Sequence, residues 1–228
     1  MRPCWWGMTN FPTPPAWART GLAQLTQIDP DFARIEKLAG PLPWRTRQPG
    51  FECLLNAIVG QQISNQAAAA IWRRLTTHTA ALVPAGFLTI SEDDLRAAGL
   101  SRPKISHARA VADAFEAGVL VTEALAAMDD AAAITTMTGV RGIGPWSAEI
   151  YLLFALQRPD VMPAGDVALQ AALADLKALP ARPSPKVLRE LAEPWAPHRS
   201  LAARLLWHWW RHLTGRPSTD DLAAAARP

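Results

Sequence analysis

A glycine-rich segment at residues 138–148 has the composition of a tight turn that another molecule can approach closely. Its sequence, Thr-Gly-Val-Arg-Gly-Ile-Gly-Pro-Trp-Ser-Ala, places Gly142 and Gly144 on either side of Ile143. Glycine removes the Cβ that would hinder such an approach, and Pro145 suits the first position of a following helix. The free N–H groups of this turn, with the positive end of that helix behind them, suit a phosphate of a DNA backbone. On these residues alone, a plain connector between two helices is the alternative.

One aspartate follows this segment at the expected start of a helix. Asp166 comes after Gly165 and directly before the apolar-periodic residues 167–169. Taken by itself this position predicts a helix N-cap, and the helix dipole holds a carboxylate there in its anionic form. The competing carboxylate, Asp160, lies beside Pro159 and is interpreted as a loop residue.

Tryptophans gather near the end of the chain. Of the ten in the sequence, Trp207, Trp209 and Trp210 crowd into four positions. At ~100° per helical residue, Trp207 and Trp210 lie within about 60° of each other, whereas Trp209 points elsewhere. One face of such a helix can supply a wall on which a base stacks, while the other packs into the core; core packing of all three is the alternative.

Composition restricts the classes of protein to consider. The 228 residues carry 23 Lys+Arg against 20 Asp+Glu, a net charge of +3, so any nucleic-acid surface must be local. Hydrophobic residues make up 50%, which supports a real core. No apolar run approaches the ~20 residues of a membrane span and no secretory signal is visible, so we expect a cytoplasmic protein. Cys4 and Cys53 are too few for a four-thiolate cluster, and His208 and His212 lack an acidic third ligand.

Helical periodicity covers almost every segment from Leu22 onward, and no run alternates with period two for long enough to predict a strand. The sequence therefore predicts an all-α fold of about ten helices. The first 20 residues contain four prolines, so we expect an extended arm there, and a tail over residues 216–228. The clearest helices are predicted at residues 64–77, 104–117, 122–128, 130–137, 145–156, 167–179, 184–192 and 198–214.

Four ordered motifs resemble the helix-hairpin-helix DNA glycosylases, and in particular their 3-methyladenine DNA glycosylase II type. The resemblance covers roughly residues 21–215, without the β-rich N-terminal domain of the longer members. The motifs are the hairpin at 140–148, Asp166 lying 24 residues after Gly142, the helix and DNA-wedge loop at 51–64, and the segment 195–200 followed by Trp207.

This resemblance implies a catalytic role for Asp166, whose anion would face the sugar C1′ and orient water as the glycosidic bond breaks. Trp146, Trp207 and Tyr151 are implied to bind the base, with Ile150 standing where the family often has a pocket tyrosine. A cationic alkylated purine would gain ~0.5–2 kcal/mol from an indole face. Trp146 occupies the position of the nucleophilic lysine of bifunctional members, so the implied enzyme is monofunctional.

The resemblance also implies contacts to double-stranded DNA that carries alkylated bases. Gln62 or Ile63 would fill the gap left by the flipped nucleotide. Gly142, Gly144, Arg141 and Arg199 would contact the DNA backbone. No cofactor is required, but the backbone carbonyls of Thr138, Val140 and Ile143 match the places where such hairpins hold a monovalent cation. Further candidate phosphate contacts are Arg45, Arg47, Arg73, Arg102 and Lys104.

The expected architecture is a monomer with two helical lobes, one at about residues 51–140 and the other at about 21–50 plus 141–215, with the site in the cleft between them. Two other functions stay open at this point. One is a non-catalytic helix-hairpin-helix module that only binds the DNA backbone. The other is a mismatch or oxidised-base glycosylase of the same fold.

Overall fold

The computed structural model describes residues 12–217, and this part of the chain forms thirteen α-helices and two short 3₁₀-helices with no β-strand. The predicted all-α fold is confirmed. In chain order the elements are α1 (Ala16–Ile28), α2 (Asp31–Ala39), α3 (Phe51–Gly60), α4 (Asn65–Leu75), η1 (Thr79–Leu82), α5 (Pro84–Thr89), α6 (Glu92–Ala97), α7 (Arg102–Glu116), α8 (Thr122–Ala127), α9 (Asp130–Thr138), α10 (Pro145–Phe154), α11 (Val167–Leu176), α12 (Pro185–Ala192), η2 (Glu193–Trp195) and α13 (Arg199–Thr214).

Side-chain caps explain where several helices begin. The Ser64 hydroxyl accepts a hydrogen bond from the Ala67 N–H at 3.2 Å, and Asp129 accepts one from the Ala132 N–H at 2.7 Å. Such bonds satisfy backbone donors that a helix leaves open in its first turn. The start of α4 therefore agrees with the predicted cap at Ser64.

Two short helical segments were not predicted. Helix α1 begins at Ala16, so residues 16–20 are not part of an extended arm; Pro15 takes the N-cap position, where proline is tolerated. Residues 1–11 of that arm and 218–228 of the tail lie outside the described residues. Helix α5 contains Gly86, which weakens the helical signal. A Cβ at this glycine would lie 2.4 Å from the Ala80 carbonyl oxygen, so the close approach of η1 requires glycine.

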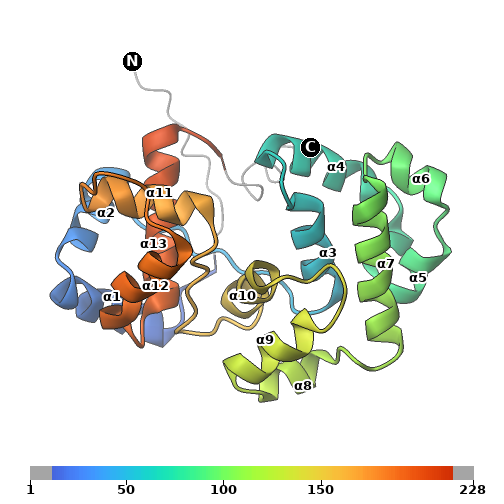
Figure 1. Ribbon diagram of the computed structural model, residues 1–228, viewed down its shortest axis with the longest axis horizontal. Helices are drawn as coiled ribbons and strands as arrows, with labels where there is room; N and C mark the ends of the chain where they lie inside the picture. The colour runs from blue at the N-terminus through green and yellow to red at the C-terminus, as the bar shows by residue number, and fades with distance from the viewer. Residues whose placement is uncertain (1–11, 218–228) are drawn as a thin grey trace.

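Buried side chains form two hydrophobic clusters. The first runs from Phe51 to Val161 and is built by α3 to α10. The second joins α1 and α2 to α11, α12 and α13, and the two groups of helices lie side by side with α10 between them (Figure 1). Ile143 is 4% exposed in the first cluster, so the turn that carries it is anchored as its flanking glycines predict.

Helix α10 packs mainly with the first group. It contacts α9 and α3, and its residues Tyr151 and Leu152 belong to the first cluster, whereas Leu153 belongs to the second. Helix α10 therefore contributes to both clusters, and the division of the chain at residue 140 stays a prediction. One face of α10 is left to border the space between the two groups.

Candidate active site

A cavity of about 780 Å³ opens between the two groups of helices. Its walls come from the end of α3 and the loop that follows, from α10, from the start of α11, from α13, and from the connector at residues 42–47. Asp166, Trp146 and Trp207 all line it, so three residues separated by up to 61 positions in the sequence meet in one place.

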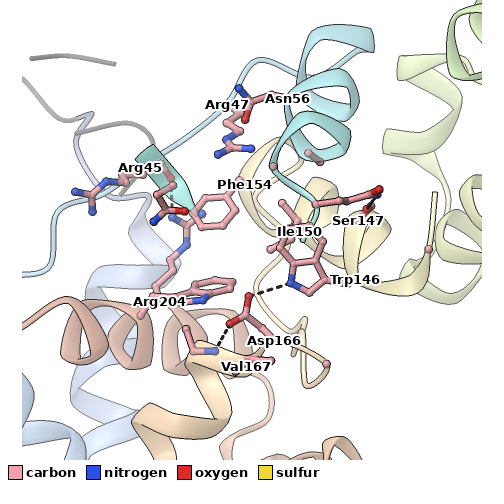
Figure 2. Close-up of a pocket in the computed structure, with 18 of the residues that line it drawn as sticks. Arg45, Arg47, Asn56, Trp146, Ser147, Ile150, Phe154, Asp166, Val167 and Arg204 are labelled. Atoms are coloured by element: carbon pink, nitrogen blue, oxygen red, sulfur yellow. Dashed lines mark hydrogen bonds between the residues drawn. The ribbon is translucent and has the colours of Figure 1, made fainter. Parts of the chain in front are cut away.

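Asp166 is held at the edge of this cavity by three N–H donors. Its Oδ1 accepts hydrogen bonds from the backbone of Ala168 at 2.8 Å and Leu169 at 3.1 Å, which confirms the predicted N-cap of α11. Its Oδ2 accepts one from the indole N–H of Trp146 at 3.0 Å, and Figure 2 shows the two side chains pointing toward one another. All three donors are neutral. Among the ion pairs of residues 12–217, none includes Asp166.

An aromatic wall stands near this carboxylate. The rings of Phe154 and Trp207 lie with centroids 5.5 Å apart and planes tilted by 32°. Trp207 is half-buried, whereas Trp209 is 5% exposed and donates its indole N–H to Asp175 at 2.8 Å. The two tryptophans therefore divide between cavity and core, as their helical spacing predicts. Phe154 was not predicted, although Trp146, Ile150 and Phe154 follow one another at four-residue intervals along one face of α10.

A largely buried cation, which also lines the cavity, packs against the ring of Phe154. Arg204 is 4% exposed. The Cζ of its guanidinium lies 4.0 Å from the ring centroid of Trp44 and 4.6 Å from that of Phe154. It donates hydrogen bonds to the carbonyls of Arg45 at 2.6 Å and Leu153 at 2.7 Å. Burial lowers the pKa of Arg204 to about 9, so it remains charged at neutral pH. Sequence analysis did not single out this residue.

The glycine-rich turn lies where α9 ends and α10 begins. Gly142 has a φ of +98°, and a Cβ there would lie 2.4 Å from the Cβ of His107, so only glycine fits. A Cβ at Gly144 would meet nothing within 4 Å. The Val140 carbonyl accepts a hydrogen bond from the Ile143 N–H at 3.1 Å, which closes the turn and leaves this oxygen a second lone pair.

The predicted wedge residues occupy the loop after α3. Gln62 is exposed with a φ of +57°, and Ile63 is 37% exposed. Both line the cavity. A large apolar side chain held in the open is a structural requirement for insertion into a base stack.

Comparison with protein families decides which class of protein this arrangement belongs to. The model of the HhH-GPD superfamily of base excision DNA repair proteins matches residues 55–197, which include the wedge loop, the hairpin and Asp166. The chain belongs to the HhH-GPD superfamily.

Individual relatives of this HhH-GPD protein agree with that assignment. The chain is 30% identical over 190 residues to DNA-3-methyladenine glycosylase 1 of Schizosaccharomyces pombe, covering 80% of this chain and 83% of that protein. A structure of the 3-methyladenine DNA glycosylase Mag1 of that yeast, in complex with abasic DNA, has a TM-score of 0.77 at 29% identity and covers 84% of this chain and 95% of its own. A crystal structure of the DNA-3-methyladenine glycosidase of Bacillus halodurans has a TM-score of 0.71 at 30% identity. It covers 95% of this chain and 100% of its own.

Two residues expected at the site of this HhH-GPD protein lie elsewhere. Tyr151 is fully buried and does not line the cavity; its hydroxyl oxygen accepts a hydrogen bond from the Gly50 N–H at 3.0 Å, and burial raises the pKa of this phenol. Ile150, one position earlier, faces the cavity instead. Arg199 donates two side-chain hydrogen bonds to Asp160, at 2.7 and 2.6 Å, and lines a separate small cavity.

The Arg199 pair also affects the acidity of Asp160. Burial alone would raise the pKa of the Asp160 carboxyl, but hydrogen bonds and charge from Arg199 hold that pKa below its ordinary value. Of the other predicted phosphate contacts, Arg45 and Arg47 line the main cavity, and Arg141 is exposed beside the hairpin. The Lys104 ammonium instead donates to the Val59 carbonyl at 2.6 Å.

Among residues 12–217, no group of three or more His, Cys, Asp or Glu side chains could hold a metal ion. No helix in the same range is long and apolar enough to span a membrane.

Proposed function

We propose that this protein is a monofunctional DNA glycosylase that hydrolyses the N-glycosidic bond of alkylated bases in duplex DNA. 3-Methyladenine and 7-methylguanine are the expected substrates. The observation that carries this proposal is the Asp166 carboxylate, which three neutral N–H donors hold at the edge of an aromatic cavity. The likeness to two 3-methyladenine glycosylases at about 30% identity over most of the chain supports it independently.

Catalysis follows from the charge of Asp166. When the bond between C1′ and the base nitrogen breaks, its electron pair leaves with the base and positive charge develops on the sugar. A fixed anion stabilises that charge, because it acts in a partly desolvated cavity and needs no reorganisation. Water then adds to C1′ and gives up a proton to the carboxylate or to solvent. Oδ1 already accepts two hydrogen bonds, so the lone-pair capacity left for the water lies on Oδ2, which accepts only the bond from Trp146.

The aromatic wall accounts for the substrate class. A purine methylated at a ring nitrogen carries positive charge, so its departure needs no protonation by the enzyme. The Trp207 indole attracts such a base by cation–π interaction and stacking. This preference is modest, and it is sufficient because alkylation has already weakened the bond.

DNA must be bound and distorted before the base can enter. We assign the Gly142–Gly144 turn to a backbone phosphate and the Gln62–Ile63 pair to the gap left by the flipped nucleotide. A monovalent cation held by the carbonyls of Thr138, Val140 and Ile143 would add positive charge beside that phosphate. The protein would act as a monomer on chromosomal DNA.

Mass spectrometry of the bases released from methylated duplex DNA tests the proposal. We expect 3-methyladenine and 7-methylguanine in solution, intact strands until alkali is added, and no covalent adduct after borohydride, since no lysine lies between Lys104 and Lys177. Binding of duplex DNA without release of any base would instead favour the non-catalytic module. Release confined to 8-oxoguanine would favour the oxidised-base enzyme.

A further inference from the structure

Gln61, which no predicted role includes, joins the wedge loop to the hairpin. It follows α3 directly and precedes the exposed pair Gln62–Ile63. Its side chain does not follow theirs into solvent. The Nε2 amide donates hydrogen bonds to the Gly142 carbonyl and to the Ser147 hydroxyl, each at 3.2 Å.

Both acceptors of Gln61 are rigid. The Gly142 carbonyl belongs to a turn whose backbone is fixed by its φ of +98° and by contact with His107. Ser147 is 2% exposed in the first turn of α10, next to Trp146, which bonds to Asp166. The Gln61 amide therefore connects the wedge loop to the Gly142–Gly144 turn, which is proposed to bind phosphate. It also connects the loop to α10, whose Trp146 is hydrogen-bonded to Asp166.

The wedge loop is also fastened from its other sides. The Lys104 ammonium binds the Val59 carbonyl at 2.6 Å, in the last turn of α3. Ser64 caps α4 where the loop ends. Helices α3 and α10 pack against each other, so the bonds of Gln61 bridge two elements already in contact (Figure 1). Only Gln62 and Ile63 are left to project.

We propose that Gln61 is a positioning residue that sets the wedge pair Gln62–Ile63 relative to the phosphate-binding turn. This inference rests on the proposed glycosylase function. Capture of the backbone at Gly142–Gly144 then places the wedge at a fixed distance from it, so that binding of the phosphate and eviction of the base proceed together. Without the two bonds, the loop would lose its register with the hairpin.

The test uses a substrate pair that separates eviction of the base from its cleavage. The same 7-methylguanine is placed opposite cytosine, where a pair must be broken, or opposite an abasic nucleotide, where it need not. In single-turnover reactions, Gln61→Met should slow excision opposite cytosine by about tenfold or more, and opposite the abasic nucleotide by less than about threefold. Ser147→Ala, which removes one of the two acceptors, should change the ratio in the same direction by a smaller factor.

Controls separate positioning from folding. A loss of folded protein lowers both rates equally and leaves their ratio unchanged, and Gln24→Met on the exposed face of α1 should change neither rate. Equal losses on the two substrates would overturn the proposal, because Gln61 would then act on the cavity or the fold. Unchanged rates would overturn it as well. A wild-type protein that releases no base from either duplex would overturn the proposed function, and this inference with it.

Discussion

Two carboxylates, Asp160 and Asp166, lie in the same segment between α10 and α11, and their surroundings are opposite. Asp160 receives two hydrogen bonds from the Arg199 guanidinium and one from the Arg199 backbone N–H at 3.2 Å. Asp166 receives only neutral N–H donors, two from the backbone and one from Trp146. Both side chains are well bonded, but only the first has its charge cancelled by a cation.

This difference supports the proposed catalytic role of Asp166 and a structural role for Asp160. The bidentate pair of Arg199 and Asp160 ties the segment between α10 and α11 to the start of α13, and the two charges offset each other. Neutral donors orient Asp166 equally well and leave its net negative charge facing the cavity. The sequence predicts Asp166 as a helix N-cap and Asp160 as a loop residue, but it does not show that Asp160 pairs with the distant Arg199.

The largest effect is expected from exchanging each carboxylate for its amide. Asp166→Asn should reduce single-turnover excision by about a thousandfold while binding to undamaged duplex stays the same, because the developing positive charge loses its partner. Asp160→Asn should keep the excision rate and lower the free energy of unfolding by roughly 1–2 kcal/mol. Rates and thermal melting of both variants check this. An inactive, normally stable Asp160→Asn would reverse the assignment.

A second comparison concerns the two tryptophans of α13. Trp207→Ala should reduce excision of cationic 7-methylguanine by about tenfold to a hundredfold with a small change in stability, since stacking and cation–π contact are lost. Trp209→Ala should do the reverse, because it leaves a cavity in the core and removes the donor to Asp175. Single-turnover excision rates and melting temperatures of the two variants test this prediction. Near-normal excision by Trp207→Ala would contradict the account of substrate choice.

The two glycines of the hairpin are expected to differ in role: Gly142 is needed for folding, and Gly144 is proposed to contact a DNA phosphate. Gly144 has open space for a side chain, so Gly144→Asp should fold normally and weaken binding to all duplexes alike, by about tenfold, through repulsion of phosphate. Gly142→Ala should instead destabilise the fold, since its Cβ would overlap His107. Binding titrations on damaged and undamaged duplexes test the first variant. A loss confined to damaged DNA would contradict a phosphate role.

The smallest effect on catalysis is expected at a third carboxylate, Glu149. Burial raises its pKa to about 7, against the lowering influence of Arg189 at 3.8 Å. The folded protein thus keeps a proton up to about pH 7 that the unfolded chain releases near 4.5, so the free energy of unfolding should fall as pH rises between these values.

Glu149→Gln removes that titration. Relative to this variant, the wild type should lose up to ~3 kcal/mol of stability between pH 5 and pH 8. Denaturant titrations of both proteins across this range measure the difference. Parallel stability curves would show that Glu149 is ionised throughout.

Much of the fold follows from local rules that the sequence displays. Helical periodicity and the caps at Ser64 and Asp166 predict where helices begin. Helix α5 is not predicted because Gly86 weakens its helical pattern. Glycine is needed there for close packing against Ala80, and this contact cannot be predicted from the sequence. Periodicity also identifies the buried face of a helix without telling whether that face meets a core or a cavity.

The same limit explains the site. Trp207 and Trp209 were separated correctly because they lie on different faces of one helix. The sequence does not tell which of Tyr151 and Ile150 borders the cavity, because both belong to apolar α10 and only tertiary packing decides it. Arg204 reads as a solvated charge in the sequence; its burial depends on carbonyls of Arg45 and Leu153, which lie 159 and 51 positions away.

We propose that the uncancelled charge of Asp166 faces the sugar of the flipped nucleotide. The most direct measurement compares binding to two duplexes, one with a positively charged pyrrolidine in place of the damaged sugar and the other with a neutral tetrahydrofuran. Wild type should bind the charged duplex much more tightly, by about a hundredfold, because it resembles the transition state, and Asp166→Asn should lose this preference. Equal affinity of the wild type for both duplexes, or a preference that survives in Asp166→Asn, would contradict the account.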